Sequence, residues 1–339
     1  MGKLAIIGLG LIGGSMGLAL RRAEPVDTVV TGYDRDVEVG MRAHKAGAID
    51  RLATSAADAV RDATMVIIAT PITSVRRVFE EIAPHLRPNT VVTDTASTKG
   101  EVMRWARDIL PRNVYFVGGH PMAGKEQSGN EAAEESLFDD RPYIVIPTVD
   151  AHQGAVNAVL DLARAIGARP QFLDAEEHDA YAAAISHVPL VASIALFSLA
   201  RNSNAWPELA GMAGPSFRDL TRLASGSPEM SHDIFLTNKD NLVHWLDRYL
   251  TEVYRLRDLI EASEPESLYR ALAEAALERE EFIQNPPTRK ESLPDTELPS
   301  IAESLLGSMA LNRAKELSGE LEKRQKERER EDRLRRRDS

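Results

Sequence analysis

The chain has 339 residues and a formal net charge of −11, and 43% of its residues are hydrophobic and 27% charged. This composition is ordinary for a globular protein, and the length is enough for two domains. An acidic chain has no overall attraction to nucleic acid or anionic lipid, so we expect neither as a partner. The sequence has no cysteine, which excludes disulfides, iron–sulfur clusters and thiol nucleophiles and argues against a structural zinc site.

The N-terminus shows no targeting signal. Met1 is followed after two residues by the apolar run 4–7, which Gly8 ends. No stretch approaches the ~20 apolar residues that a membrane-spanning helix needs. We therefore expect a cytoplasmic protein that does not enter a membrane.

Residues 1–173 alternate short apolar runs with amphipathic segments. Near-continuous apolar runs are typical of strands in a parallel sheet that is covered on both faces. The alternation predicts a Rossmann-type, doubly wound parallel sheet. Strands are expected at 4–7, 28–33, 65–69, 90–93, 114–117, 143–146 and 171–173, and helices after the first strand and at 39–46, 72–86, 99–110 and 153–166.

Residues 174–283 have a different character and are expected to be almost wholly helical. Apolar side chains recur three and four residues apart, which predicts helices at 179–201, 228–236, 239–263 and 265–282. An all-helical, Ala-rich half of this kind is typical of a dimerisation domain. Residues 284–339 are expected to be a Pro-rich linker and a charged tail, with a modest helix at 301–317. The tail is interpreted as solvated, and a role in binding a partner or nucleic acid is the alternative.

Residues 8–13, GLGLIG, fit the pattern G-x-G-x-x-G between an expected strand and an expected helix. Gly8 permits a tight turn, Gly10 lets the backbone approach a pyrophosphate, and Gly13 lets the helix pack closely on the sheet. The N–H groups at the helix start, at Leu11 and Ile12, would hold the diphosphate. The alternative is a glycine-rich turn that binds nothing.

Asp34 ends the second expected strand, where a carboxylate accepts hydrogen bonds from both adenine-ribose hydroxyls. It therefore predicts NAD as the cofactor, although Arg35 next to it leaves NADP open. Thr70 and Pro71 follow the 65–69 strand and would lie at the carboxyl edge of the sheet, where Rossmann ligands bind. Pro71 is equally well explained as the start of a helix.

Polar residues that a core does not need gather in three more places: 94–100 and 118–126, each directly after an expected strand, and 186–189 with 216–222 in the helical half. The first two are expected at the same sheet edge as the cofactor. With these stretches the sequence resembles the prephenate and arogenate dehydrogenases. The matching stretches are GLGLIGGS (8–15), DTASTKG (94–100), GGHPMAGKEQSG (118–129), EHD (177–179), SHVP (186–189) and SFRDLTRLA (216–224).

The resemblance covers roughly residues 1–283 and implies a homodimeric, NAD-dependent enzyme. Its reaction would be the oxidative decarboxylation of prephenate to 4-hydroxyphenylpyruvate, of arogenate to tyrosine, or of both. Hydride leaves C4 of the substrate ring, so the C4 hydroxyl must lose its proton, and carbon dioxide leaves from C1. No regulatory domain is expected in the tail.

His120 is the candidate for the proton acceptor, because a neutral imidazole has a suitable pKa. The resemblance implies that Ser97 orients His120 or bridges to the nicotinamide. Arg222 is the candidate for the carboxylate, which a guanidinium grips with two parallel hydrogen bonds. The resemblance further suggests an ionic network of Glu126, Asp219 and Arg222.

The resemblance also implies that His187 lines the substrate site. The alternatives are a backbone-capping histidine at 120, surface ion pairs at 126, 219 and 222, and a histidine buried between helices at 187. Many prephenate-using members read S-H-x-P-H, whereas this chain has Leu190 in the last position. Leucine cannot hydrogen-bond the pyruvyl side chain of prephenate, so we hypothesise that arogenate is accepted and even preferred.

Two other classes of function stay open. One is a different hydride-transfer enzyme, such as a β-hydroxyacid dehydrogenase or an imine reductase. The β-hydroxyacid enzymes use a lysine in the helical half, and the context of Lys239 does not suggest that role. The other is a non-catalytic NAD-binding module.

Overall fold

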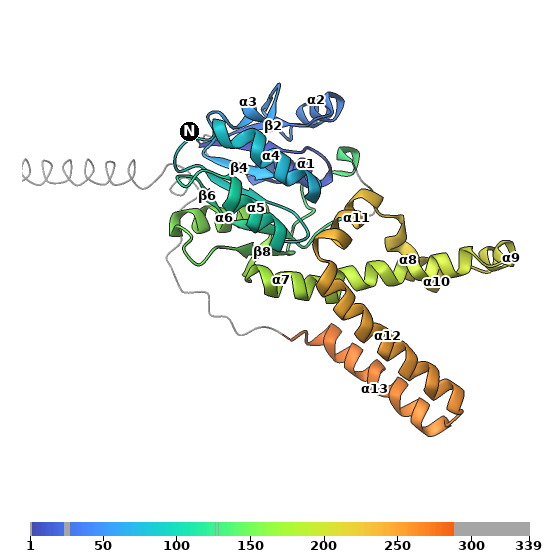
Figure 1. Ribbon diagram of the computed structural model, residues 1–339. Helices are drawn as coiled ribbons and strands as arrows, with labels where there is room; N and C mark the ends of the chain where they lie inside the picture. The colour runs from blue at the N-terminus through green and yellow to red at the C-terminus, as the bar shows by residue number, and fades with distance from the viewer. Residues whose placement is uncertain (1, 24–27, 126, 128, 288–339) are drawn as a thin grey trace, which may run out of the picture. The chain divides into compact units, whose positions relative to one another are not determined.

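The computed structural model describes residues 2–23, 28–125, 127 and 129–287 (Figure 1). The chain divides into two compact units, and it passes from one to the other between Ala175 and Glu176. We call them the N-terminal unit and the helical unit. The expected charged tail and the expected helix at 301–317 lie outside the described residues.

The N-terminal unit is built on a six-stranded, wholly parallel sheet. Its chain starts in the middle of the sheet, moves outward on one side, and then crosses to the other side. Such a reversal between β1 and β4 is where open α/β sheets bind ligands. The doubly wound Rossmann-type fold is thereby confirmed. In spatial order the strands are β3 (Arg51–Leu52), β2 (Thr28–Tyr33), β1 (Gly2–Ile7), β4 (Met65–Ile68), β5 (Val91–Asp94) and β6 (Tyr115–Phe116).

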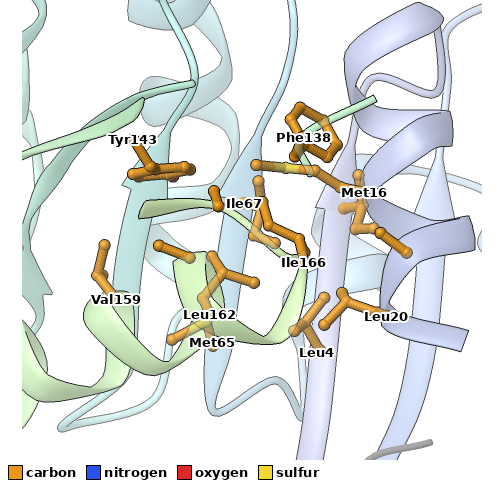
Figure 2. Packing of buried hydrophobic residues seen from close by; sticks show 14 of the residues in the cluster. Leu4, Met16, Leu20, Met65, Ile67, Phe138, Tyr143, Val159, Leu162 and Ile166 are labelled. Atoms are coloured by element: carbon orange, nitrogen blue, oxygen red, sulfur yellow. The ribbon is translucent and has the colours of Figure 1, made fainter. Parts of the chain in front are cut away.

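Helices cover both faces of this sheet because the strand side chains alternate between two cores. Leu4 and Ile6 face a core shared with α1 (Leu11–Ala23) and α6 (Gln153–Ala165), part of which is drawn in Figure 2. The residues between them face α3 (Ala56–Val60), α4 (Ile72–Ile82) and α5 (Gly100–Ile109). On that side Phe79 meets Phe116 edge to face, with ring centroids 5.5 Å apart. The helix α2 (Val37–Lys45) packs beside β2 and β3.

The N-terminal unit also contains a second sheet of three strands. They are β7 (Gly118–Pro121), β8 (Pro142–Ile146) and β9 (Arg169–Phe172). β7 pairs with β8 antiparallel, and β8 pairs with β9 parallel. The strands expected at 143–146 and 171–173 therefore belong to this second sheet and not to the main parallel sheet, and residues 118–121, expected only to follow a strand, form a strand themselves. The sequence Gly-Gly-His-Pro has no β-branched residue, so its strand is specified by the partner strand rather than by local preference.

The helical unit contains the expected helices with one interruption. The expected helix 179–201 is instead α7 (Ala175–Ala182), a π-helical turn (Ala183–His187) and α8 (Val188–Arg201). Pro189 has no N–H to donate to the carbonyl four residues earlier, where a regular α-helix needs a bond. The remaining helices are α9 (Trp206–Gly211), α10 (Pro215–Thr221), α11 (Pro228–Thr237), α12 (Lys239–Ala262) and α13 (Pro265–Gln284).

Within the described part of the chain, one helical run, Ala175–Arg201, is long and apolar enough to cross a membrane by length and composition. The expectation that no stretch approaches this length was wrong, because residues 180–200 carry no charged side chain and are interrupted only by a few uncharged polar ones. The same run carries His178, Asp179 and His187 as buried polar side chains. Such groups are costly in lipid, whereas the centre of a helix bundle accommodates them when they are hydrogen-bonded.

Candidate functional site

The glycine turn joins β1 to α1 closely. Gly8 has a φ of +92°, which favours glycine, and its N–H donates to the carbonyl of Tyr33 at 2.8 Å. A Cβ on Gly13 would collide with the carbonyl oxygen of Gly8, so only glycine lets the helix start this near the turn. A Cβ on Gly10 would meet nothing within 4 Å. The backbone at Gly10 therefore borders open space that a ligand can approach.

Asp34 lies beside this turn. Its Oδ2 accepts the N–H of Leu9 at 2.8 Å, and its Oδ1 accepts the N–H of Asp36 at 2.9 Å. These bonds fix a carboxylate at the end of β2, next to the start of α1. Because each carboxylate oxygen has further acceptor capacity, it can still receive ribose hydroxyls. A pyrophosphate would find the backbone N–H groups of Leu11 and Ile12 at the first turn of the helix.

Thr70 and Pro71 follow β4, the neighbour of β1. Thr70 Cγ2 would lie 3.0 Å from a Cβ built on Gly8, which shows how near its side chain is to the turn. Pro71 immediately precedes α4 and is exposed. The turn, Asp34 and Thr70 are thus gathered at one edge of the sheet, and this arrangement fits a dinucleotide.

Asp94 and Lys99 form an ion pair with both side chains fully buried. Both side chains hydrogen-bond to the backbone of Gly119, the second residue of β7. Asp94 Oδ1 accepts the N–H of Gly119 at 3.2 Å, and Lys99 Nζ donates to the carbonyl of Gly119 at 2.6 Å. Asp94 Oδ2 also accepts the N–H of Ala96 at 2.9 Å. One buried pair therefore connects the loop after β5 to the strand β7.

Ser97 lies in the loop after β5, and His120 lies in β7, the two segments that the Asp94–Lys99 pair connects. Ser97 is half-buried in the loop that Asp94 and Lys99 bracket, and His120 follows the clamped Gly119 and is 8% exposed. His120 is paired with Ile144 in the β7–β8 ladder, so its backbone is positioned by β8 and by the neighbouring Gly119. Burial raises the pKa of the neighbouring Tyr143 hydroxyl, and the Asp94 carboxylate adds to the rise. Tyr143 therefore stays protonated and is no rival to His120 as a base.

His187 lies in the π-helical turn of the helical unit and is fully buried. Its Nδ1 is 3.2 Å from Nδ2 of Asn238, whose Nδ2 also donates to the backbone carbonyl of Asp179 at 2.7 Å. Next to it, His178 Nδ1 is 2.8 Å from Oδ1 of Asp179. Burial lowers the pKa of His187 to about 4, Asp179 opposes this shift, and His178 adds to it.

The other predicted residues of the helical unit lie in or near α10. Asp219 is in α10 and Arg222 follows it, and both side chains are exposed. Leu190, in the first turn of α8, is buried. Glu126 lies outside the described residues, so the expected ionic network remains a prediction. Among the described residues, no group of three or more His, Asp or Glu side chains comes together as a metal site.

The sequence analysis did not predict two structural roles. Asp94 and Lys99 lie within the motif 94–100, but their ion pair was not predicted. A carboxylate and a lysine five residues apart at the end of a strand could have indicated it. Asn238 belonged to no motif, and nothing in its local sequence indicates a histidine 51 residues earlier as its partner.

Comparisons with known proteins agree with this arrangement. Residues 16–171 match the family described as prephenate dehydrogenase, nucleotide-binding domain, and residues 174–274 match prephenate dehydrogenase, dimerization domain. The chain is 37% identical over 269 residues to a prephenate dehydrogenase of Bacillus subtilis, covering 79% of this chain and 72% of the relative. It is 34% identical over 268 residues to a cyclohexadienyl dehydrogenase of Zymomonas mobilis, covering 78% and 90%.

Solved structures show the same likeness. The prephenate dehydrogenase of Aquifex aeolicus in complex with hydroxyphenyl propionate and NAD+ has a TM-score of 0.77 and 30% identity, with 83% of this chain and 98% of that chain covered. The arogenate dehydrogenase of Synechocystis has a TM-score of 0.70 and 28% identity, with 83% and 99% covered. With both halves matched in order and the glycine turn in place, the chain belongs to the prephenate dehydrogenase family.

Proposed function

We propose that the protein is a NAD-dependent prephenate or arogenate dehydrogenase that oxidatively decarboxylates a cyclohexadienol. The observation that carries the proposal is the open glycine turn with Asp34 fixed beside it, in a chain whose two halves both match this family. Family membership favours this activity over the β-hydroxyacid dehydrogenase and imine reductase alternatives. It also favours catalysis over a non-catalytic NAD-binding module.

The N-terminal unit holds the cofactor in this proposal. The N–H groups of Leu11 and Ile12 bind the diphosphate, with Gly8, Gly10 and Gly13 giving the backbone access. Asp34 accepts the adenine-ribose hydroxyls and repels a 2′-phosphate, which favours NAD over NADP. When bound, NAD supplies a hydride acceptor. Thr70 and Pro71 border the same edge of the sheet.

His120 takes the proton from the C4 hydroxyl in this proposal. Proton transfer to a positioned base is typically worth ~10²–10⁴-fold in rate. The Asp94–Lys99 pair connects the strand that carries His120 to the loop that carries Ser97, which supports the proposal that Ser97 orients the imidazole. The aromatic product makes loss of carbon dioxide essentially irreversible.

Arg222 binds a substrate carboxylate in this proposal, and His187 lines the same site. Glu126 and Asp219 complete the ionic network with Arg222. An apolar residue at position 190 offers no hydrogen bond to the pyruvyl group of prephenate, and it is buried. This supports turnover of arogenate. We further propose that the protein is a cytoplasmic homodimer formed through the helical unit, as the match to a dimerization domain supports.

The test is a panel of purified protein with NAD or NADP and with prephenate or arogenate, followed by the absorbance of the reduced nicotinamide. We expect turnover with NAD and a higher kcat/KM for arogenate. Absence of turnover with both substrates would overturn the proposed function. A strong prephenate preference would overturn the substrate choice alone, and Leu190→His should raise kcat/KM for prephenate if the argument holds.

A further inference from the structure

The contacts of Asn238 determine the orientation of its own side-chain amide. One amide atom lies 2.7 Å from the backbone carbonyl oxygen of Asp179. A carbonyl oxygen only accepts hydrogen bonds, so this atom must be the nitrogen. The other amide atom, Oδ1, accepts a hydrogen bond from Nδ2 of Asn241 at 2.9 Å, which agrees with the same orientation.

This orientation determines where His187 carries its proton. The second hydrogen of the Asn238 amide nitrogen is directed to Nδ1 of His187, 3.2 Å away. A ring nitrogen that accepts a hydrogen bond carries no proton, so in the neutral imidazole the proton is on Nε2. Nε2 is buried and has no hydrogen-bond partner among the described residues. A buried donor without a partner is costly to a fold, unless a ligand completes it.

We propose that Asn238 is a positioning residue that holds His187 as a neutral Nε2–H donor for an acceptor oxygen of the bound ring substrate. The identity of that ligand rests on the proposed function, whereas the tautomer does not. Asn238 acts through His187 and does not touch the substrate. The hydrogen bond from Asn238 Nδ2 to the backbone carbonyl of Asp179 fixes the orientation of the Asn238 side chain.

The surroundings favour the neutral ring. Burial lowers the pKa of His187 to about 4, which leaves it uncharged at neutral pH. The charged or titratable groups that bear on it are Asp179, which favours the charged ring, and His178, which disfavours it. The Asp179 carboxylate is 2.8 Å from His178 Nδ1, and Asn238 meets Asp179 at its backbone oxygen instead. The amide, rather than a carboxylate, is therefore the group that faces Nδ1.

The first test reads the tautomer directly. Long-range ¹H–¹⁵N correlation spectra of the ¹⁵N-histidine-labelled full chain distinguish a protonated from an unprotonated ring nitrogen, and His187→Gln assigns the signal. At pH 7 we expect Nδ1 unprotonated and Nε2 protonated. A protonated Nδ1 in the wild-type protein would overturn the proposal without any variant being made.

The second test compares Asn238→Asp, at the residue that precedes α12, with Asn241→Ala in the first turn of that helix as the matched control. A carboxylate at 238 presents an acceptor to Nδ1, so it should move the proton to Nδ1 or charge the ring. We expect a rise in KM for the ring substrate of roughly tenfold, an unchanged KM for NAD and a smaller change in kcat. Asn241→Ala leaves the donor to His187 in place and should change neither the spectrum nor the KM.

The outcomes separate the inference from the proposed function. If wild-type protein turns over neither ring substrate, the proposed function fails and the spectra still decide the tautomer. If it is active and Asn238→Asp leaves both the ring signals and the KM unchanged, the role of Asn238 is refuted. Asn238→Leu, which removes the donor without adding a charge, gives a second reading if the aspartate variant does not fold.

Discussion

Asp94 and Lys99 show how a fully buried charge pair can position a residue, here the proposed base His120, through its neighbour Gly119. Their side chains have no exposure, and the pair takes both backbone polar groups of Gly119. Neither residue needs to touch a ligand for this. The pair instead limits the relative movement of the loop that carries Ser97 and the strand that carries His120.

Replacing one member of this pair should destabilise the fold strongly. Lys99→Met leaves Asp94 as an unpaired buried carboxylate, which typically costs about 3–5 kcal/mol. The double variant Lys99→Met/Asp94→Asn removes both charges and should recover most of that loss. Urea unfolding of the two single variants and the double variant measures the coupling. Additive losses would show that the pair is not energetically coupled.

His120→Asn and Arg222→Ala should separate the kinetic parameters. Asparagine keeps a polar side chain but is no base, so kcat should fall by ~10²–10⁴-fold with KM little changed. Arg222→Ala removes binding of the carboxylate, so KM should rise while kcat changes less. Initial rates with NAD and the better ring substrate decide this. A reversed pattern would exchange the two proposed roles.

His187 should make the free energy of unfolding depend on pH. Its folded-state pKa is about 4, against an ordinary value of 6.5. Between these values the unfolded chain binds a proton that the folded chain refuses, so stability falls as pH drops through this window and levels off below it. The contribution is ~3 kcal/mol. The free energy of unfolding of wild type, minus that of His187→Gln, should therefore be lower at pH 4.5 than at pH 7. The same difference at both pH values would contradict the shift in the pKa of His187.

The sequence suggests a site residue where a motif or the end of a strand marks it. Asp34 and His120 both come shortly after apolar runs that are predicted to be strands, so both are expected near the edge of a sheet. Asn238 has no such marker, because its partners are brought to it by the packing of α12 against the π-helical turn. Which nitrogen of His187 carries a proton depends on that packing and cannot be obtained from the chain order.

At the scale of elements, the β1–turn–α1 segment offers a matched pair of substitutions. Gly13→Ala adds a Cβ that collides with the Gly8 carbonyl, whereas Gly10→Ala adds one into open space. We expect Gly13→Ala to lower thermal stability and NAD affinity together. Gly10→Ala should keep the stability within ~0.5 kcal/mol and still weaken NAD, because its methyl occupies the approach to the diphosphate. Thermal unfolding and NAD titration by fluorescence check both, and equal losses of stability would contradict the assignment.

Most elements followed from hydrophobic patterning, and the exceptions have local causes. The Gly-Gly-His-Pro strand β7 has no hydrophobic pattern of its own, since its pairing depends on residues of β8 that lie 22–28 positions further along the chain. The interruption before α8 comes from Pro189, which the apolar pattern of 179–201 conceals. Short elements such as β3 and α3 contain too few residues to establish a period.

At the scale of the whole molecule, the helical unit exposes much apolar surface. Along α12, Tyr249, Val253, Leu256 and Ile260 are all exposed and recur four, three and four residues apart, which places them on one face. Apolar faces of this extent mark interaction surfaces. A second copy of the chain is the proposed occupant.

Val253→Glu should weaken the proposed dimer, because burying an unpaired carboxylate against an apolar face is costly. We expect the dimer Kd to rise roughly 100-fold, as measured by sedimentation equilibrium. Thr251→Glu places the same charge on the opposite face of α12 and should leave the association unchanged. A monomeric wild-type protein, or equal effects of both variants, would argue against dimerisation through this face.

Gly119 bears on how intolerance to mutation is interpreted in this family. A Cβ there would lie 2.6 Å from the Asp94 carbonyl oxygen and would also strike the Tyr143 hydroxyl. In a saturation screen, position 119 should therefore reject even alanine, as strictly as position 120 should reject other residues if His120 is the proposed base. The two adjacent positions would look alike in such a screen for unrelated reasons, one steric and one chemical, so only assays that separate protein abundance from turnover would tell them apart.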